Sequence, residues 1–95
     1  MEMNQIRYFL AVCEELNFTR AADRCGVAQP SVTNGLRCLE QELGGPLFHR
    51  KPRVEPTDLG RAIRASLQNI LDQAEHTRQA ARTYLSCPPG HGPTM

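Results

Sequence analysis

The sequence lacks the features that mark membrane, secreted and disulfide-rich proteins. No apolar run approaches the ~20 residues that cross a bilayer, so no membrane span is expected. The N-terminus has no basic segment followed by an apolar stretch, as a secretion signal would require, and we therefore expect a cytoplasmic protein. The four cysteines form no C-x-x-C pair, and we expect Cys13 and Cys25 to be small core residues.

Groupings typical of catalysis or metal binding are missing as well. There is no Ser-His-Asp arrangement, no pair of catalytic carboxylates and no glycine-rich phosphate loop, so we expect neither enzyme activity nor a cofactor. No metal-ligand spacing occurs among the remaining candidates, which are His49, His76, His91, Cys38 and Cys87. We therefore expect no metal and no small-molecule site. A metal- or redox-responsive repressor of another winged-helix class is an alternative that would require clustered ligands.

Positive charge is scarce overall but unevenly placed. The formal net charge is +1. Residues 19–64 hold eight basic and five acidic side chains, whereas residues 65–95 hold two of each. A local excess of this kind is a weak electrostatic indication of nucleic-acid binding in the middle of the chain.

Two short helices are predicted first. The first runs from Asn4, its N-cap, to Asn17, and its buried face follows the i, i+3, i+4, i+7 spacing of Ile6, Phe9, Leu10, Cys13 and Leu16. Thr19 is the expected N-cap of the second helix, with Phe18 packed ahead of it. Gly26 ends this helix in a tight turn.

A third helix follows with two distinct faces. Pro30 fits its first turn, and Gly44-Gly45-Pro46 ends it. The large apolar residues fall within ~60° of arc at ~100° per residue, and are Val32, Leu36, Leu39 and Leu43. The opposite face carries Pro30, Thr33, Asn34, Arg37 and Gln41. A short helix, a tight turn and a helix of this kind predict a helix-turn-helix whose second helix enters a DNA groove.

A wing and a long helix complete the predicted architecture. Residues 47–49 and 54–55 suggest two short strands around the basic turn 51–53. Thr57 caps a fourth helix over residues 58–85, roughly 40 Å long at 1.5 Å per residue. This helix carries a weak heptad pattern at Ile63, Leu67, Ile70, Ala74, Thr77, Ala81 and Tyr84. A chain of this size cannot cover such a helix, so we expect a second copy to pair with it. Residues 86–95 are rich in Pro and Gly and are expected to be disordered.

Over residues 3–85 the chain resembles the N-terminal region of LysR-type transcriptional regulators. The matching segments are IRYFLAV, FTRAAD, VAQPSVTNGLRCLEQELG, PLFHR and PTDLG. The resemblance implies a mainly α fold, with a winged helix-turn-helix over residues 1–57 and a linker helix over 58–85 that pairs two subunits. It also implies regulation of transcription. Family members usually continue into an effector-sensing domain, and this sequence stops where that domain would begin.

Three positions depart from the family pattern. Ala28 stands where Ser is common, which removes a capping hydroxyl. Asn34-Gly35 replaces a frequent Arg-Gln pair, and Gly35 should weaken the helix by up to ~1 kcal/mol relative to Ala. The wing is one residue short, and Pro56 should truncate its second strand. These departures bear on DNA affinity and site preference more than on the fold.

These patterns together predict a partner and a set of binding residues. We expect a homodimer on double-stranded DNA with an inverted-repeat site. The candidate DNA-binding residues are Thr19, Arg20, Gln29, Pro30, Ser31, Thr33, Asn34, Arg37, Arg50, Lys51 and Arg53. Arg37 contacts either a guanine or a phosphate, Thr19 is a phosphate ligand or only a cap, and Arg53 is the candidate for the minor groove. The candidate dimerisation residues are Ile63, Leu67, Ile70, Ala74, Thr77 and Ala81. The alternative function is an interaction module that pairs through the last helix and binds DNA weakly.

Overall fold

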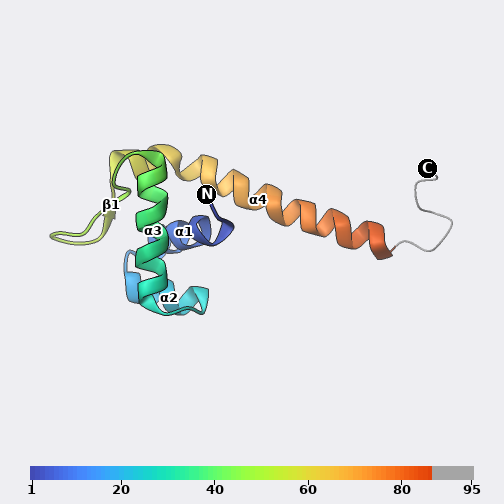
Figure 1. Ribbon diagram of the computed structural model, residues 1–95, viewed down its shortest axis with the longest axis horizontal. Coiled ribbons are helices and arrows are strands. Elements are labelled where there is room, and N and C mark those ends of the chain that lie inside the picture. The colour runs from blue at the N-terminus through green and yellow to red at the C-terminus, as the bar shows by residue number, and fades with distance from the viewer. Residues whose placement is uncertain (87–95) are drawn as a thin grey trace.

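The computed structural model describes residues 1–86, so the expectation of a disordered tail falls on residues that lie almost wholly outside the described part. In chain order the elements are α1 (Met3–Glu15), α2 (Phe18–Cys25), α3 (Gln29–Leu43), β1 (Phe48–His49), β2 (Glu55–Pro56) and α4 (Asp58–Ser86). Figure 1 shows α1, α2 and α3 gathered at one end of the molecule with the wing beside them, while α4 extends away from this end. The predicted mainly α fold, with three helices, a two-stranded wing and a long last helix, is confirmed.

The core lies where α1, α2 and α3 meet the base of the wing. Its fully buried large side chains are Ile6, Phe9, Val12, Val32, Leu36, Leu39 and Leu47. Phe48 of β1 joins the wing to this core, because its ring lies 5.4 Å from that of Phe9 and 6.2 Å from that of Phe18, centroid to centroid. Cys13 is buried as expected, whereas Cys25 is only half-buried against the core.

The ends of α1 differ from the prediction. Asn4 lies inside the helix, and the N-cap is Glu2, whose backbone N–H donates to Oε1 of Gln5 at 3.3 Å. At the other end Leu16 was expected on the buried face. It instead adopts a left-handed conformation with φ of 52° after the last helical residue, and its side chain is exposed. The apolar periodicity located the helix but could not identify which polar side chain caps it.

The cap of α2 also differs from the prediction. Asn17 is the N-cap, and its Oδ1 accepts a hydrogen bond from the Arg20 backbone N–H at 2.8 Å. Thr19 lies one residue inside the helix, so it is not the cap. Asn is at least as good an N-cap as Thr, and Leu16 in its left-handed turn leaves Asn17 extended at the required position. Gly26 ends α2 with φ of 72°, as the sequence predicts.

Thr57 holds the start of α4 against the base of the wing. Its Oγ1 accepts the Gly60 backbone N–H at 3.0 Å and donates to the Pro46 carbonyl at 2.7 Å. Its own backbone N–H donates to the Leu47 carbonyl at 2.9 Å. The predicted cap is therefore confirmed, and the same residue also continues the hydrogen bonding of the short wing. Each wing strand has two residues, and Pro56 pairs with Phe48.

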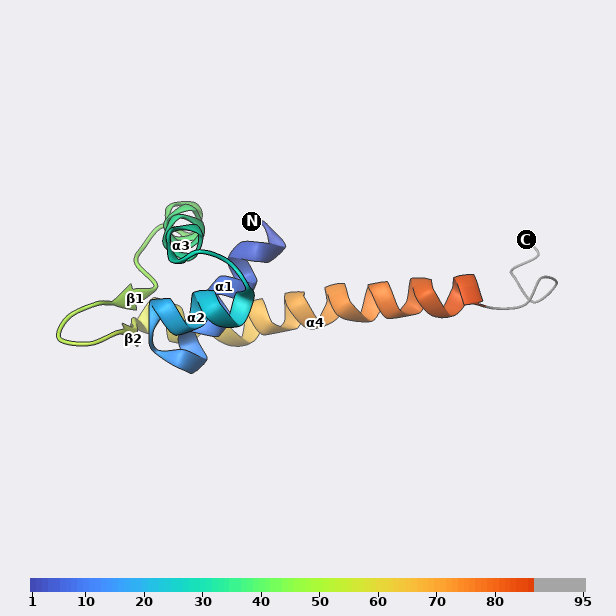
Figure 2. The same ribbon diagram turned by 90° about the horizontal axis from the view of Figure 1, so that it is seen from below.

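Only the first half of α4 packs against the rest of the chain. Leu67 is 3% exposed and belongs to the core, with Ile63 and Leu71 packed beside it. Leu67 therefore cannot serve in a contact between subunits, contrary to the prediction. Every residue from 75 to 86 is exposed, and Figure 2 shows this half of α4 extending clear of the other helices. The radius of gyration is 17.0 Å. A compact domain of this length would have a value of about 12 Å.

Candidate nucleic-acid interface

The outward face of α3 carries the residues expected to contact bases. Val32, Leu36 and Leu39 are fully buried and fix the inner face of the helix. On the other side the side chains of Gln29, Pro30, Asn34 and Arg37 are exposed, and that of Thr33 is half-buried. Figure 2 shows α3 end-on, at the edge of the helical end of the molecule. The arrangement leaves amide, hydroxyl and guanidinium groups free to contact a ligand.

Two features of α3 organise this face. Gln29 donates from Nε2 to Oγ1 of Thr33 at 3.3 Å, which links two side chains on consecutive turns. Pro30 lies in the first turn, and no side chain caps the helix at Ala28. The missing hydroxyl predicted from the sequence is therefore confirmed. In the turn before α3, the Val27 backbone N–H donates to the Ala22 carbonyl at 3.0 Å, which fixes the path between α2 and α3.

A contact behind α3 was not predicted. Tyr8 of α1 packs against Gly35, and a Cβ added at Gly35 would lie only 2.7 Å from Cδ2 of the Tyr8 ring. Gly35 is therefore required for a close approach of α1 and α3, in addition to its effect on helix propensity. The sequence signal was a glycine in the middle of an otherwise amphipathic helix, which often marks a close packing contact.

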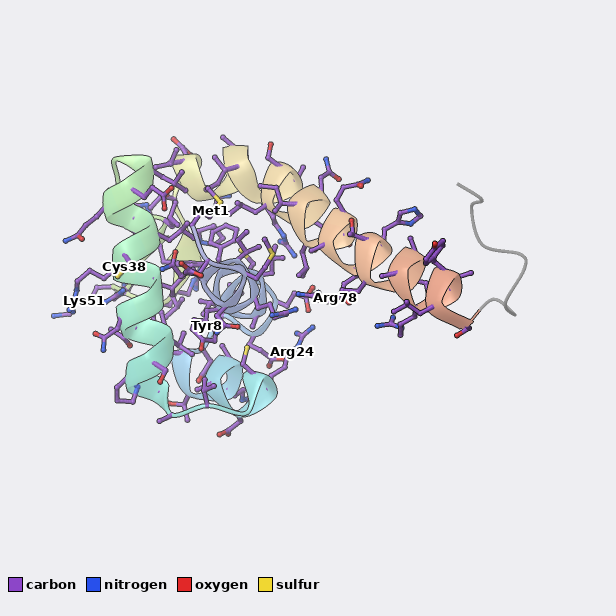
Figure 3. All side chains as sticks on the ribbon, turned by 45° about the vertical axis from the view of Figure 1, so that its right-hand side comes forward. Met1, Tyr8, Arg24, Cys38, Lys51 and Arg78 are labelled. Atoms are coloured by element: carbon purple, nitrogen blue, oxygen red, sulfur yellow. The ribbon has the colours of Figure 1, made fainter. Side chains whose placement is uncertain are left out.

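The basic residues of the wing differ in their surroundings. The Arg50 guanidinium lies 4.7 Å from the centre of the Phe18 ring, a cation–π contact that holds it beside α2. Nε of Arg53 donates to the Glu55 carboxylate at 2.7 Å. Among residues 1–86 Lys51 has no hydrogen bond or ion pair, and Figure 3 shows it projecting outward on the same side as α3. Glu55 and Phe18 were not identified from the sequence as residues of this interface.

The remaining predicted DNA contacts flank this surface. Thr19 and Arg20 are exposed in the first turn of α2, and Ser31 is exposed in the first turn of α3. Arg24, in contrast, is paired with both Glu14 and Glu15 of α1, and the Glu14 hydrogen bond raises the pKa of Arg24. Near the outward face of α3, Arg20 and Arg37 form no ion pair with any side chain of residues 1–86, so both are available to an anionic ligand.

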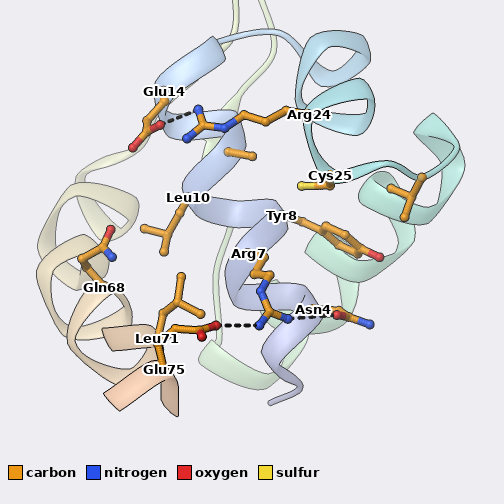
Figure 4. A pocket seen from close by; sticks show the side chains of 12 residues that line it. Asn4, Arg7, Tyr8, Leu10, Glu14, Arg24, Cys25, Gln68, Leu71 and Glu75 are labelled. Carbon is orange, nitrogen blue, oxygen red and sulfur yellow. Dashed lines mark hydrogen bonds and ion pairs between the residues drawn. The ribbon is translucent and has the colours of Figure 1, made fainter. Parts of the chain in front are cut away.

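A separate hollow of about 550 Å³ opens between α1, the end of α2 and the first half of α4. Figure 4 shows Leu10, Tyr8 and Leu71 among its walls, with the Arg7–Glu75 ion pair of 3.2 Å at one side. Its arginines are paired with carboxylates, so it offers no free cation for an anionic ligand. Within residues 1–86 no group of three or more His, Cys, Asp or Glu side chains could hold a metal ion. No helix in that range is long and apolar enough to cross a membrane.

Sequence comparison relates the chain to bacterial regulators. The family model described as "Bacterial regulatory helix-turn-helix protein, lysR family" matches residues 3–61. The chain is 41% identical over 83 residues to the "Probable cat1 operon transcriptional activator" of Acinetobacter lwoffii, which covers 86% of this chain and 27% of that protein. It is also 41% identical over 83 residues to the "HTH-type transcriptional regulator BudR" of Klebsiella aerogenes, covering 86% of this chain and 58% of that one. The chain thus spans less than two thirds of the length of either relative.

Solved structures resemble the chain over nearly all of its length. The crystal structure of a CbnR_DBD-DNA complex matches with a TM-score of 0.80 and 37% identity, covering 87% of this chain and 97% of that one. The crystal structure of a BenM_DBD/catB site 1 DNA complex matches with a TM-score of 0.85 and 32% identity, covering 93% and 99%.

Proposed function

Since the chain belongs to the LysR family of bacterial helix-turn-helix regulators, we propose that it binds specific sites on double-stranded DNA and so regulates transcription. The observation that carries this proposal is the exposed polar face of α3, which lies opposite a fully buried apolar face. A helix of this kind fits the major groove, where amide and guanidinium side chains distinguish base pairs. The DNA complexes of two structurally similar domains support the same use of the fold.

We assign the exposed residues to different parts of the duplex. Gln29, Pro30, Thr33, Asn34 and Arg37 face the major groove. Thr19, Arg20 and Ser31 flank α3 and contact backbone phosphates. The wing contacts flanking DNA through Arg50, Lys51 and Arg53. Because Arg53 is paired with Glu55, its entry into a minor groove requires that this exposed ion pair open first, at a cost of about 1 kcal/mol or less.

The protein acts as a two-fold dimer in this proposal. Exposed side chains along α4 leave Ile70, Thr77 and Tyr84 available for a second copy. Two-fold symmetry then predicts an inverted-repeat site with recognition helices one or more helical turns apart. Neither catalysis nor a metal has a role, and the site of action is the cytoplasm, where bacterial DNA lies.

Selection from random duplexes followed by gel-shift titration tests this proposal. We expect enrichment of an inverted repeat and a binding constant that weakens steeply with salt. Arg37→Ala should cost about 1–3 kcal/mol and relax preference at one base step if Arg37 contacts a base. A uniform loss on all sequences would make it a phosphate contact. A folded dimer that binds no duplex even in dilute buffer would contradict the proposed function.

An interaction module with feeble DNA binding remains the second candidate. The observation that favours it is the exposed apolar surface at the end of α4, where Tyr84 is 53% and Leu85 79% exposed. Gly35 does not favour this candidate, because its lack of a side chain allows α3 to pack closely against Tyr8. The same titration separates the two functions, since an interaction module would associate strongly without selecting a site.

A further inference from the structure

Gly35 lies in the middle of the helix that faces DNA, at a position where glycine is costly. α3 runs over 15 residues from Gln29 to Leu43, and Gly35 is its seventh. Glycine is, after proline, the residue least favourable to the interior of a helix. A Cβ at Gly35 would lie 2.7 Å from Cδ2 and 3.0 Å from Cε2 of Tyr8, and 3.7 Å from Cγ of Gln5. Ordinary van der Waals contact begins at 3.4 Å, so only glycine allows the observed approach.

The edge of the Tyr8 ring that meets Gly35 lies near the base of the ring rather than at the far end of the side chain. Cδ2 is bonded directly to Cγ, so this edge moves away only if χ1 or χ2 changes or if α1 itself shifts. α1 is anchored on both sides of Tyr8 by Ile6 and Phe9, which are fully buried. Tyr8 is itself half-buried and packs against the same core. α3 is anchored in the same way by its own fully buried side chains, so a side chain added at Gly35 would change the distance between the two helices.

The change in distance would affect the residues that face the groove. Asn34 precedes Gly35 directly and Arg37 follows two residues later, and both are exposed on the outward side. A bidentate contact to a base requires donor–acceptor distances of about 2.7–3.2 Å and a suitable angle, so a shift of a few tenths of an ångström is enough to weaken it. The distance between α1 and α3 thus sets how far these two side chains reach.

We propose that Tyr8 is a positioning residue for DNA recognition: its ring, seated on Gly35, fixes the height and tilt of α3 and thereby selects the bases that Asn34 and Arg37 contact. This inference rests on the proposed function and adds a determinant of site preference that does not touch DNA. The ring acts as a spacer between α1 and α3, and its hydroxyl has no part in the contact.

The test compares base preference across five variants of the chain, of which Tyr8→Ala alone is the fifth. Each is titrated on the selected site and on single-base substitutions of it, with thermal unfolding as a measure of folding. Gly35→Ala should bind the original site about tenfold or more weakly and change preference at the steps facing Asn34 and Arg37. Gly35→Ala combined with Tyr8→Ala removes the obstructing ring, so it should recover part of the original preference. Two further variants are controls.

Tyr8→Phe keeps the ring and should have the same affinity and base preference as the unaltered protein. Val12→Ala is the control for stability, because it removes buried volume from the core at a position other than Gly35.

The outcomes separate a positioning contact from a structural one. If Gly35→Ala lowers stability as Val12→Ala does while base preference stays unchanged, the inference is overturned and the proposed function stands. If Gly35→Ala does not fold, Tyr8→Ala alone decides the matter, because loss of the spacer should broaden preference at the same two steps. Unchanged preference in Tyr8→Ala would then overturn the inference. If the unaltered protein binds no duplex, the proposed function fails and this inference fails with it.

Discussion

Gly60 is a residue at which a single added methyl group should disrupt the junction of wing and linker helix. It is buried in the first turn of α4, directly beneath the Leu47 carbonyl oxygen. A Cβ there would collide with that oxygen, which already accepts the Thr57 backbone N–H at 2.9 Å. We expect Gly60→Ala to destabilise the fold by about 1–3 kcal/mol, as overpacking does, although alanine is the better helix former.

Thermal unfolding followed by circular dichroism measures this effect. In a domain of this size a loss of 1 kcal/mol lowers Tm by about 4–8 °C. Ser66→Ala is the matched control, because Ser66 is exposed on α4 and its replacement should change stability by no more than about 0.5 kcal/mol. A Gly60→Ala protein with an unchanged or higher Tm would show that the junction can yield.

Cys13 should make stability depend on pH above neutrality. Burial raises the pKa of the Cys13 thiol from its ordinary value of 9.0 to about 11, although Arg64 acts in the opposite direction. Between pH 9 and 11 the unfolded chain loses this proton while the folded chain keeps it, so the free energy of unfolding falls as pH rises. We expect the decline to be shallower in Cys13→Ala. Denaturant titrations of both proteins from pH 8 to 11 measure the free energy of unfolding at each pH. The other ionisable groups are common to both proteins, so their effects cancel in the difference. If the two free energies fall in parallel with pH, the raised pKa of Cys13 is contradicted.

Individual contacts of the site were harder to predict than the residues themselves. The outward face of α3 could be predicted, because periodicity within one helix fixes which side chains share a side. Gly35 was interpreted only as a weakness, because its ring partner Tyr8 lies on another helix. Asn17 and Thr19 are both good caps, and the choice between them depends on the left-handed turn at Leu16. The sequence pattern of one helix shows which of its residues share a face, but not how closely that face approaches another helix.

The wing carries three cations in three different states, and only one of them is unpaired. Arg50 is held over Phe18 and Arg53 is bound to Glu55, while Lys51 has no partner in residues 1–86. Releasing condensed counterions from DNA requires a cation that reaches a phosphate, so Lys51 should make the full contribution. We expect Lys51→Ala to lower the slope of log K against log salt concentration by about one unit.

Glu55→Gln serves as the companion variant, since it frees Arg53 without altering the length of the wing. If Arg53 can then reach DNA, binding should tighten and the salt slope should steepen, whereas Lys51→Ala lowers it. Gel shifts at several salt concentrations measure both slopes. An unchanged slope in Lys51→Ala would remove this residue from the interface.

The two halves of α4 have different surroundings, and this difference defines where a second copy can pack. At ~100° per residue, Ile70, Thr77 and Tyr84 lie roughly 60–100° around the helix from Leu67, which faces the chain's own core. The heptad pattern predicted from the sequence combined two neighbouring stripes, one turned toward α1 and one left exposed. The two stripes could not be told apart from the sequence of α4 alone, because both carry apolar residues at similar spacing. The structure distinguishes them, because Leu67 and Leu71 pack against the core and the other stripe does not.

Dimerisation should therefore depend on the exposed stripe and not on Leu67. We expect Ile70→Glu combined with Tyr84→Glu to yield a monomer in which α1, α2 and α3 remain folded, because two charges would be buried against two like charges across the axis. Gln79→Glu is the control, since Gln79 is exposed and lies roughly 140–180° around α4 from Ile70, Thr77 and Tyr84. Sedimentation measures the mass, and the circular dichroism signal and Tm show whether the fold persists. Leu67→Glu should instead lower Tm sharply, because it places a carboxylate in the core. A double variant that still sediments as a dimer would move the subunit contact to another face of α4.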